Sequence, residues 1–210
     1  MKSKLILIAL LLFTQVSFSQ NAKTILDNAS SAFSKAGGIN ASFTILQQDA
    51  KAKNTYTQDG TASIKGNNFK FEVPDGITWF DGKTQWVMAK GSDEVNISNP
   101  TGEELAAISP TALLGMYKKG FTLNYKGQFT DMGKSVDRVE MIPQKKSEIS
   151  KFEVNINKQN NQITSITIHN TDSTKTILQI KKYQTGVNLP DSTFLFNKKD
   201  YPEIDIIDLR

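Results

Sequence analysis

Few side chains in this sequence have the type and spacing that catalysis or metal binding requires. His169 is the only histidine and there is no cysteine, so no second such residue is present to build a metal site with it. The many serines lack a plausible His-Asp arrangement to activate them. Helix N-terminal and tail contexts explain the acidic pairs Glu103-Glu104 and Asp205/Asp208 without catalysis. We therefore predict that the protein is not an enzyme, that it needs no metal or cofactor, and that His169 is a surface residue.

Large apolar side chains are gathered instead in residues 77–88. Asp81-Gly82 is a two-residue turn signal, because glycine adopts positive φ without strain and aspartate tolerates it better than most residues. A tryptophan lies on each side of this turn. Trp86 and Met88 have the same parity, so they share one face of the second strand, which we expect to point inward. Such residues form either the ordinary core of a sheet or the wall of a cavity.

The start of the chain has the features of an export signal. Two lysines, an apolar run over residues 5–13 and small residues up to Ser19 predict a secretory signal peptide over residues 1–19. Residues 20–210 would then form one exported domain. Without cysteine this domain has no disulfide framework and no lipid-anchoring residue.

The charge of the protein excludes one class of partner. The net charge of +4 falls to +2 when the two lysines of the signal are removed (4 − 2). The sequence has no Lys/Arg stripe with interleaved aromatic residues, so we do not expect it to bind nucleic acid.

The hydrophobic pattern along the chain is mainly that of strands. Residues 24–36 have helical spacing and end at a pair of glycines. From there, segments such as Phe69–Val73 alternate apolar and charged residues, as in an antiparallel sheet with one covered face. Residues 99–121 interrupt the pattern with two short apolar helices. About ten strands in meander order with three helices predict a mainly β protein with α elements. We expect a single open, strongly curved antiparallel half-barrel, with an N-terminal helix and two short lid helices over its concave face.

Three short motifs lie in order along the chain: residues 40–44 (NASFT), 81–86 (DGKTQW) and 189–196 (LPDSTFLF). They resemble motifs of the periplasmic outer-membrane lipoprotein carrier proteins of the LolA type, and the resemblance covers nearly the whole mature chain. It implies a monomeric periplasmic carrier that binds the acyl chains of lipoproteins. Such a carrier receives its cargo from an inner-membrane ABC-type extractor and delivers it to an outer-membrane acceptor.

The resemblance turns the apolar residues into candidates for a lipid-binding cavity and its lid. On the strands they are Phe43, Ile45, Phe69, Phe71, Trp79, Trp86, Met88 and Phe152; on the two short helices they are Leu105, Ile108, Leu113, Leu114 and Met116.

The sequence departs from the family at one position. Better-known members have an arginine near the second strand that locks the empty lid, whereas residues 65–68 here read Lys-Gly-Asn-Asn. Lys65 is either a looser latch, since lysine lacks the planar fork of arginine, or packing alone holds the lid. Two other functions stay open: a lipid- or lipoprotein-sensing regulatory protein of the same fold, and an exported enzyme.

Overall fold

The computed structural model describes residues 21–51, 55–100 and 102–210. The predicted signal peptide lies outside these residues. Within them, no helix has both the length and the apolar character needed to cross a membrane.

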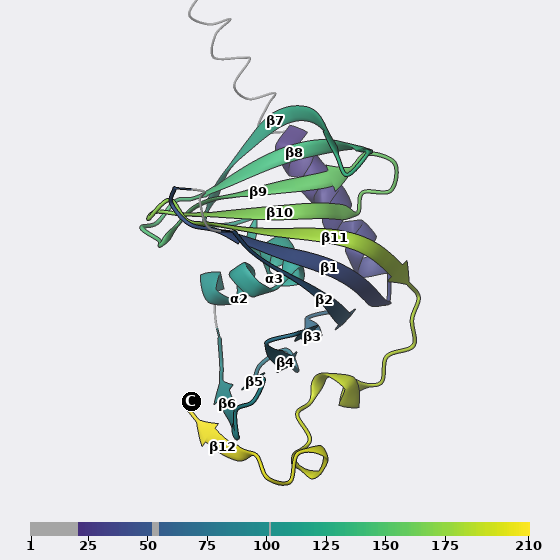
Figure 1. Cartoon of the computed structure of the whole chain (residues 1–210). Coiled ribbons are helices and arrows are strands. Elements are labelled where there is room, and N and C mark those ends of the chain that lie inside the picture. Colours follow the sequence, from purple (N-terminus) through teal and green to yellow (C-terminus); the bar gives the residue numbers. More distant parts are fainter. Residues whose placement is uncertain (1–20, 52–54, 101) are drawn as a thin grey trace, which may run out of the picture.

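Twelve strands of the described chain form one sheet in the order β12-β6-β5-β4-β3-β2-β1-β11-β10-β9-β8-β7 (Figure 1). Neighbouring strands are antiparallel except β12 and β6, which are parallel. The strands are β1 (Gly38–Gln48), β2 (Thr55–Lys65), β3 (Asn68–Val73), β4 (Gly76–Phe80), β5 (Gln85–Ala89), β6 (Glu94–Ser98), β7 (Phe121–Asp131), β8 (Lys134–Pro143), β9 (Ile149–Asn157), β10 (Ile163–Asn170), β11 (Lys175–Thr185) and β12 (Asp205–Asp208). The predicted mainly β, open architecture is confirmed, because β7 and β12 are unpaired edges.

The chain order places β1 at the middle of the sheet. β1 pairs with β2 on one side and with β11 on the other. One wing is therefore the meander β2–β6, and the other is the meander β7–β11. The helices α2 (Gly102–Ile108) and α3 (Pro110–Met116) connect the two wings.

The three α-helices in the described part of the chain pack against one face of the sheet, which we call the inner face. Residues 21–35 are helical, close to the predicted range, and Ala22, Leu26 and Ala29 of this N-terminal helix are buried. They share one core cluster with residues of α3 and with the alternating apolar residues of β8 and β9. Figure 1 shows α2 and α3 beneath β10, β11 and β1. This core fixes the face on which a cavity can form.

A second core cluster lies on the inner face of the other wing. Ile39, Phe43, Ala62, Ile64, Phe69 and Phe80 form it. The rings of Phe69 and Phe71 stack with centroids 4.5 Å apart, and Phe80 stacks on Phe69 at 5.0 Å. Such offset aromatic pairs add to the stability that burial alone gives. The two clusters meet along β1 and β11.

The C-terminal segment crosses the opposite, outer face of the sheet. After β11 it forms two short 3₁₀ helices, η1 (Asp191–Phe194) and η2 (Lys198–Asp200), and then β12. Figure 1 shows this yellow-green segment running past β4, β5 and β6. Residues 191–194 of the 189–196 motif therefore form a short 3₁₀ helix.

Candidate binding cavity

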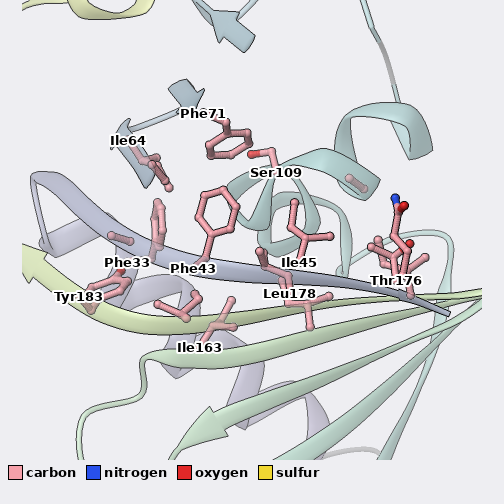
Figure 2. A pocket seen from close by; sticks show the side chains of 17 residues that line it. Phe33, Phe43, Ile45, Ile64, Phe71, Ser109, Ile163, Thr176, Leu178 and Tyr183 are labelled. Atoms are coloured by element: carbon pink, nitrogen blue, oxygen red, sulfur yellow. The ribbon is translucent and has the colours of Figure 1, made fainter. Parts of the chain in front are cut away.

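A cavity of about 280 Å³ lies on the inner face, where the two core clusters meet (Figure 2). Strands β1, β2, β3, β10 and β11, the N-terminal helix and the α2–α3 junction contribute its walls. The lining residues are Phe33, Ala41, Phe43, Ile45, Gln47, Ala62, Ile64, Phe71, Ala106, Ser109, Ile163, Ile166, Ile168, Thr176, Leu178, Ile180 and Tyr183.

Strand parity and small residues explain why space remains here. Ala41, Phe43 and Ile45 alternate along β1 and share its inner face. Gly60 of β2 lies opposite Phe43. A Cβ at Gly60 would lie 2.6 Å from Cζ of Phe43, so the missing side chain is what lets this ring lie over β2. Ala62, two residues further along β2, fills little of the remaining volume.

The chemistry of the lining suits a hydrocarbon ligand. No charged side chain is among the described residues that line the cavity, and its polar groups come from Gln47, Ser109, Thr176 and Tyr183. Burial raises the pKa of Tyr183 to about 12, so its hydroxyl is neutral at physiological pH. Because an apolar wall offers no compensation for a buried charge, this cavity excludes ionic ligands from its interior.

Three of the predicted strand residues line the cavity, namely Phe43, Ile45 and Phe71. Phe69 lies in the adjacent cluster, stacked behind Phe71. Phe152 is fully buried in the core under the helices.

Trp79, Trp86 and Met88 were expected on the inward face, and the register shows that this expectation is wrong. Trp79 is paired with Lys70, whereas the inner-face residue Phe69 is paired with Phe80. Trp86 is paired with Trp79, and Met88 with Ile77, so these residues all point to the outer face. There the Trp79 ring contacts Phe196 and Tyr201, at centroid distances of 5.6 and 5.9 Å. Trp86 and Met88 do share one face of β5, as their parity predicts, but that face is the outer one.

The two short helices differ in how firmly they are held. Leu113 and Leu114 of α3 are buried in the core, with Met116 packed beside them. Tyr117, which follows α3, donates a hydrogen bond to Asp27 of the N-terminal helix. α3 is thus part of the core in this structure.

α2 covers the cavity with less contact. Ala106 and Ser109 line the cavity, and Leu105 packs against the second cluster while remaining partly exposed. The side chain of Ile108 lies outside the described set. Ser109 accepts a hydrogen bond from the Ala112 amide at 3.4 Å and caps α3. Both short helices lie over the inner face, α3 with two buried leucines in the core and α2 with Ala106 buried and Leu105 partly exposed.

Among the described residues, the hydrogen-bond and ion-pair partners of the Lys65 ammonium group lie in the C-terminal segment and not in either short helix. Its Nζ donates to the carbonyl oxygen of Leu189 at 3.0 Å and to Asp191 at 2.9 Å. The latch interpretation is therefore corrected: Lys65 fastens the start of the C-terminal segment. The reason is its position at the end of β2, beside the route that the chain takes after β11.

Several cavity residues were missed by the sequence reasoning, chiefly Phe33, Ile64, Tyr183 and the isoleucines of β10 and β11. Two register shifts explain part of this failure. One lies opposite Ser42/Phe43 and lets both Ile180 and Tyr183 face inward. The other lies in β10, so that Ile163 and Ile166 both line the cavity. A β-bulge breaks the period of two, so parity alone assigns such residues to opposite faces.

The outer face of the β7–β11 wing carries a network of charged residues. Lys151 donates to Glu140 at 2.9 Å and to Glu153 at 2.7 Å. Burial acts to raise the pKa of Glu140 and of Glu153, but Lys151, together with the other donors and cations around them, more than offsets it, and both pKa values fall below their usual range. This arrangement keeps both carboxylates ionised and suits a structural ion-pair network.

His169 belongs to this network. Its Nε2 lies 3.5 Å from Oε1 of Glu153, and its side chain is only 16% exposed, so the surface assignment is corrected to a partly buried one. Burial lowers the pKa of His169. It lies on the face opposite the cavity, one residue from the lining Ile168. Among the described residues, no group of histidine and acidic side chains is arranged to hold a metal ion.

The sheet and the cavity define an open half-barrel with an apolar interior. A protein-family model described as outer membrane lipoprotein carrier protein LolA matches residues 12–174. Since the match covers most of the chain, the protein belongs to the LolA family.

Solved structures of low sequence identity were compared with this one, and the first of them shares its fold. An uncharacterized conserved protein from Thermus thermophilus is 12% identical, with 90% of this chain and 99% of that chain covered and a TM-score of 0.61. A LolA superfamily protein from Nitrosomonas europaea is 11% identical, with coverages of 83% and 97% and a TM-score of 0.47. In the MucA/MucB complex of Pseudomonas aeruginosa, the matched chain is 12% identical, with 85% of this chain and 62% of that chain covered and a TM-score of 0.43. From the two TM-scores below 0.5 we infer nothing further. A search of curated proteins gave no significant match.

Proposed function

We propose that the mature protein is a periplasmic carrier that shields the acyl chains of lipoproteins in its cavity and ferries them from the inner to the outer membrane. The observation that carries this proposal is the uncharged cavity on the inner face, in a chain that belongs to the LolA family. A monomer would take cargo from an inner-membrane ABC-type extractor and pass it to an outer-membrane acceptor. The protein's part is binding, with no catalytic step.

The need for a carrier follows from the energy of exposing hydrocarbon to water. Each methylene group buried is worth about 0.8 kcal/mol, so a long acyl chain cannot leave a membrane for water unaided. A carrier must recover much of this energy but not all of it, because it also has to release the cargo. Contacts that the cargo displaces on entry supply the difference.

The size of the cavity supports a role for α2 as the part that is displaced. A volume of about 280 Å³ is just below the range of about 300–1,000 Å³ that holds a drug-sized ligand. A lipoprotein with several acyl chains therefore requires a wider opening than this conformation has. We propose that α2 swings away about the Ser109-Pro110 junction, while α3 stays with the N-terminal helix.

Hydrogen exchange tests the lid, with α3 as the internal control. We expect amides of α2 to exchange faster when an acylated peptide is added, because the ligand displaces their packing, and amides of α3 to change little. Equal protection of both helices with and without ligand would contradict the hinge.

The carrier role itself is tested on protein isolated from its native envelope. Mass spectrometry is expected to find acylated protein bound, and the loaded protein is expected to release it to outer-membrane vesicles. Binding without delivery would favour the lipid-sensing alternative. If no acylated material is bound and apolar dyes do not bind either, the carrier proposal fails.

A further inference from the structure

One end of the cavity opens at an edge of the sheet. Gln47 of β1 and Thr176 of β11 are direct cross-strand neighbours that both line the cavity. Figure 2 shows Thr176 at one end of the lining and Phe33 with Tyr183 at the other. Because Gln47 is exposed, its end of the cavity, which we call the mouth, is a route by which an acyl chain reaches the interior.

Three loops of the β7–β11 wing lie at the same end of the strands as the mouth. They are residues 118–120 before β7, residues 144–148 between β8 and β9, and residues 171–174 between β10 and β11. The antiparallel register places them there, because Gln48 at the end of β1 is paired with Lys175 at the start of β11. In Figure 1 this end is on the left of the wing, opposite the arrowheads of β9 and β11.

Backbone hydrogen bonds join these loops into one surface. The Gln144 amide donates to the Gly120 carbonyl oxygen, and the Thr171 amide donates to the Glu148 carbonyl oxygen, both at 2.8 Å. In the sheet order β9 is three strand spacings from β1, or about 14 Å at about 4.8 Å for each spacing. The loops and the mouth can therefore contact one flat partner at the same time.

Lysine side chains are concentrated on this surface. Together with the turn after β1, the loops comprise residues 49–51, 118–120, 144–148 and 171–175, with six lysines, three acidic residues and a net charge of +3 (6 − 3). We call the six lysines the basic edge, and all of them are exposed: Lys51, Lys118, Lys119, Lys145, Lys146 and Lys175.

The lysines of the basic edge are available to a partner. The ion pairs of the β7–β11 wing are made by other cations, namely Lys126, Arg138, Lys151 and Lys181. Within the described part of the chain, the basic edge therefore has no carboxylate in salt-bridge contact with its ammonium groups. Its charge acts outward, on whatever approaches the mouth.

Positive charge is not spread evenly over the strand ends. At the far end of the same wing, residues 131–134 and 158–162 have a net charge of +1 (2 − 1). On the β2–β6 wing, the turns 74–75 and 90–93 lie at the mouth end and have a net charge of −1 (1 − 2). A negatively charged surface is thus attracted most strongly by the mouth end of the β7–β11 wing.

The composition of the loops favours a lipid surface over a protein surface. The core of a protein–protein interface is enriched in aromatic residues, methionine and arginine and depleted in lysine, and residues 118–120, 144–148 and 171–174 contain none of the enriched types. Clusters of about four to eight basic residues are typical of segments that bind anionic lipids. These loops also have no large apolar side chain to insert into a bilayer, so their attachment is electrostatic and readily reversed.

We propose, building on the carrier function above, that the basic edge docks the protein on an anionic phospholipid membrane with the mouth of the cavity towards the headgroups. The ammonium groups lie against lipid phosphates, and an acyl chain then has only a short path through water between the bilayer and the mouth. Docking without insertion suits a carrier that shuttles, because the contact does not depend on cargo and is lost when the protein moves beyond the screening length of the solution.

Vesicle flotation with the mature protein tests the docking. We use vesicles of phosphatidylcholine alone and vesicles with equal parts of phosphatidylcholine and phosphatidylglycerol. At low ionic strength the protein should bind the mixed vesicles about tenfold or more tightly than the neutral ones. The preference should disappear at about 1 M salt, where the Debye length is about 3 Å. Equal binding to both vesicles, or no binding to the mixed ones, would overturn the proposal.

A pair of double variants locates the docking surface. Lys145→Gln/Lys146→Gln should weaken binding to the mixed vesicles by about tenfold or more, because each lysine near an anionic surface contributes about fivefold. Lys134→Gln/Lys158→Gln removes the same two charges from exposed positions at the far end of the wing, and should weaken binding by less than about twofold. Equal losses would mean that only the net charge matters, which overturns the basic edge.

Dye binding separates this proposal from the carrier function. Both double variants should bind an apolar dye as the wild type does, because none of the four lysines lines the cavity. If the wild type binds mixed vesicles but neither dye nor acylated peptide, the basic edge stands and the carrier function fails. If the wild type does not bind the vesicles while Lys145→Gln/Lys146→Gln slows cargo uptake from native inner membranes, the lysines contact an acidic protein, and the lipid docking is wrong.

Discussion

Two apolar surfaces of the same sheet are built from similar residues, but one borders a cavity and the other is covered by packed side chains. On the inner face, Phe43 and Phe71 border a cavity of about 280 Å³. On the outer face of β3–β6, the chain's own C-terminal segment covers the aromatic residues: Phe194 is completely buried, and Phe196 and Tyr201 contact Trp79. The difference lies in the cover. The C-terminal segment contributes large rings, whereas Ala106 and Ser109 are the side chains near the α2–α3 junction that line the cavity among the described residues.

The largest effect should come from removing a ring of the filled surface. Phe194→Ala is expected to lower the free energy of unfolding by about 3–5 kcal/mol, because it leaves a void in a packed layer. Leu195 is the matched control, since it is the next residue and 42% exposed. Leu195→Ala should change stability by no more than about 0.5 kcal/mol. Urea unfolding measures both. Similar small effects at the two positions would mean that the segment is not a packed layer.

At the cavity, a larger side chain should reduce ligand binding and have little effect on stability. Ala62 is buried and lines the cavity. Ala62→Phe should reduce affinity for an apolar dye by about tenfold or more, while stability changes by about 1 kcal/mol or less because the ring has space to enter. Ala89→Phe, at an exposed position of β5, should not affect dye binding. A large loss of stability with unchanged dye binding would show that the space is not the ligand site.

The tryptophans distinguish the two surfaces by spectroscopy. Trp79 and Trp86 are the only tryptophans of the chain, and both lie on the outer face. Binding of an acylated peptide should therefore leave the emission maximum unchanged, since the ligand does not reach them. Phe194→Ala should shift it to longer wavelength by admitting water to Trp79. A ligand-induced shift in the wild type would place the binding surface on the outer face.

Local patterns were sufficient to predict much of the fold. The alternation in Phe69–Val73, the helical spacing near Leu26 and the break at residues 99–121 each depend on neighbours in sequence, and the structure has a strand, a helix and two helices at these places. Phe43 and Ile45, which the family resemblance made cavity candidates, both line the cavity.

The face of the hairpin could not be predicted in this way. Strand parity predicts that Trp86 and Met88 lie on the same face of the sheet. It does not predict which face, because that depends on what covers each one. The face of the tryptophans is covered by the C-terminal segment, more than a hundred residues later in the sequence. The cavity residues Ile180 and Tyr183 were hidden by a register shift that no local pattern reveals. Both failures concern long-range packing, which overrides local periodicity.

The smallest effect on stability is expected at the start of the C-terminal segment, where Lys65 contacts Leu189 and Asp191. The side chains of Lys65 and Asp191 are 46% and 79% exposed, so their ion pair is well solvated. Lys65→Ala should lower the free energy of unfolding by about 1 kcal/mol or less. It should not change the rate of dye uptake, because Lys65 fastens the outer cover and not α2. Asp191→Asn, which removes the other partner, should have a similar small effect. Faster dye uptake in Lys65→Ala with unchanged stability would instead make Lys65 a latch of the cavity, and the two surfaces would then be coupled.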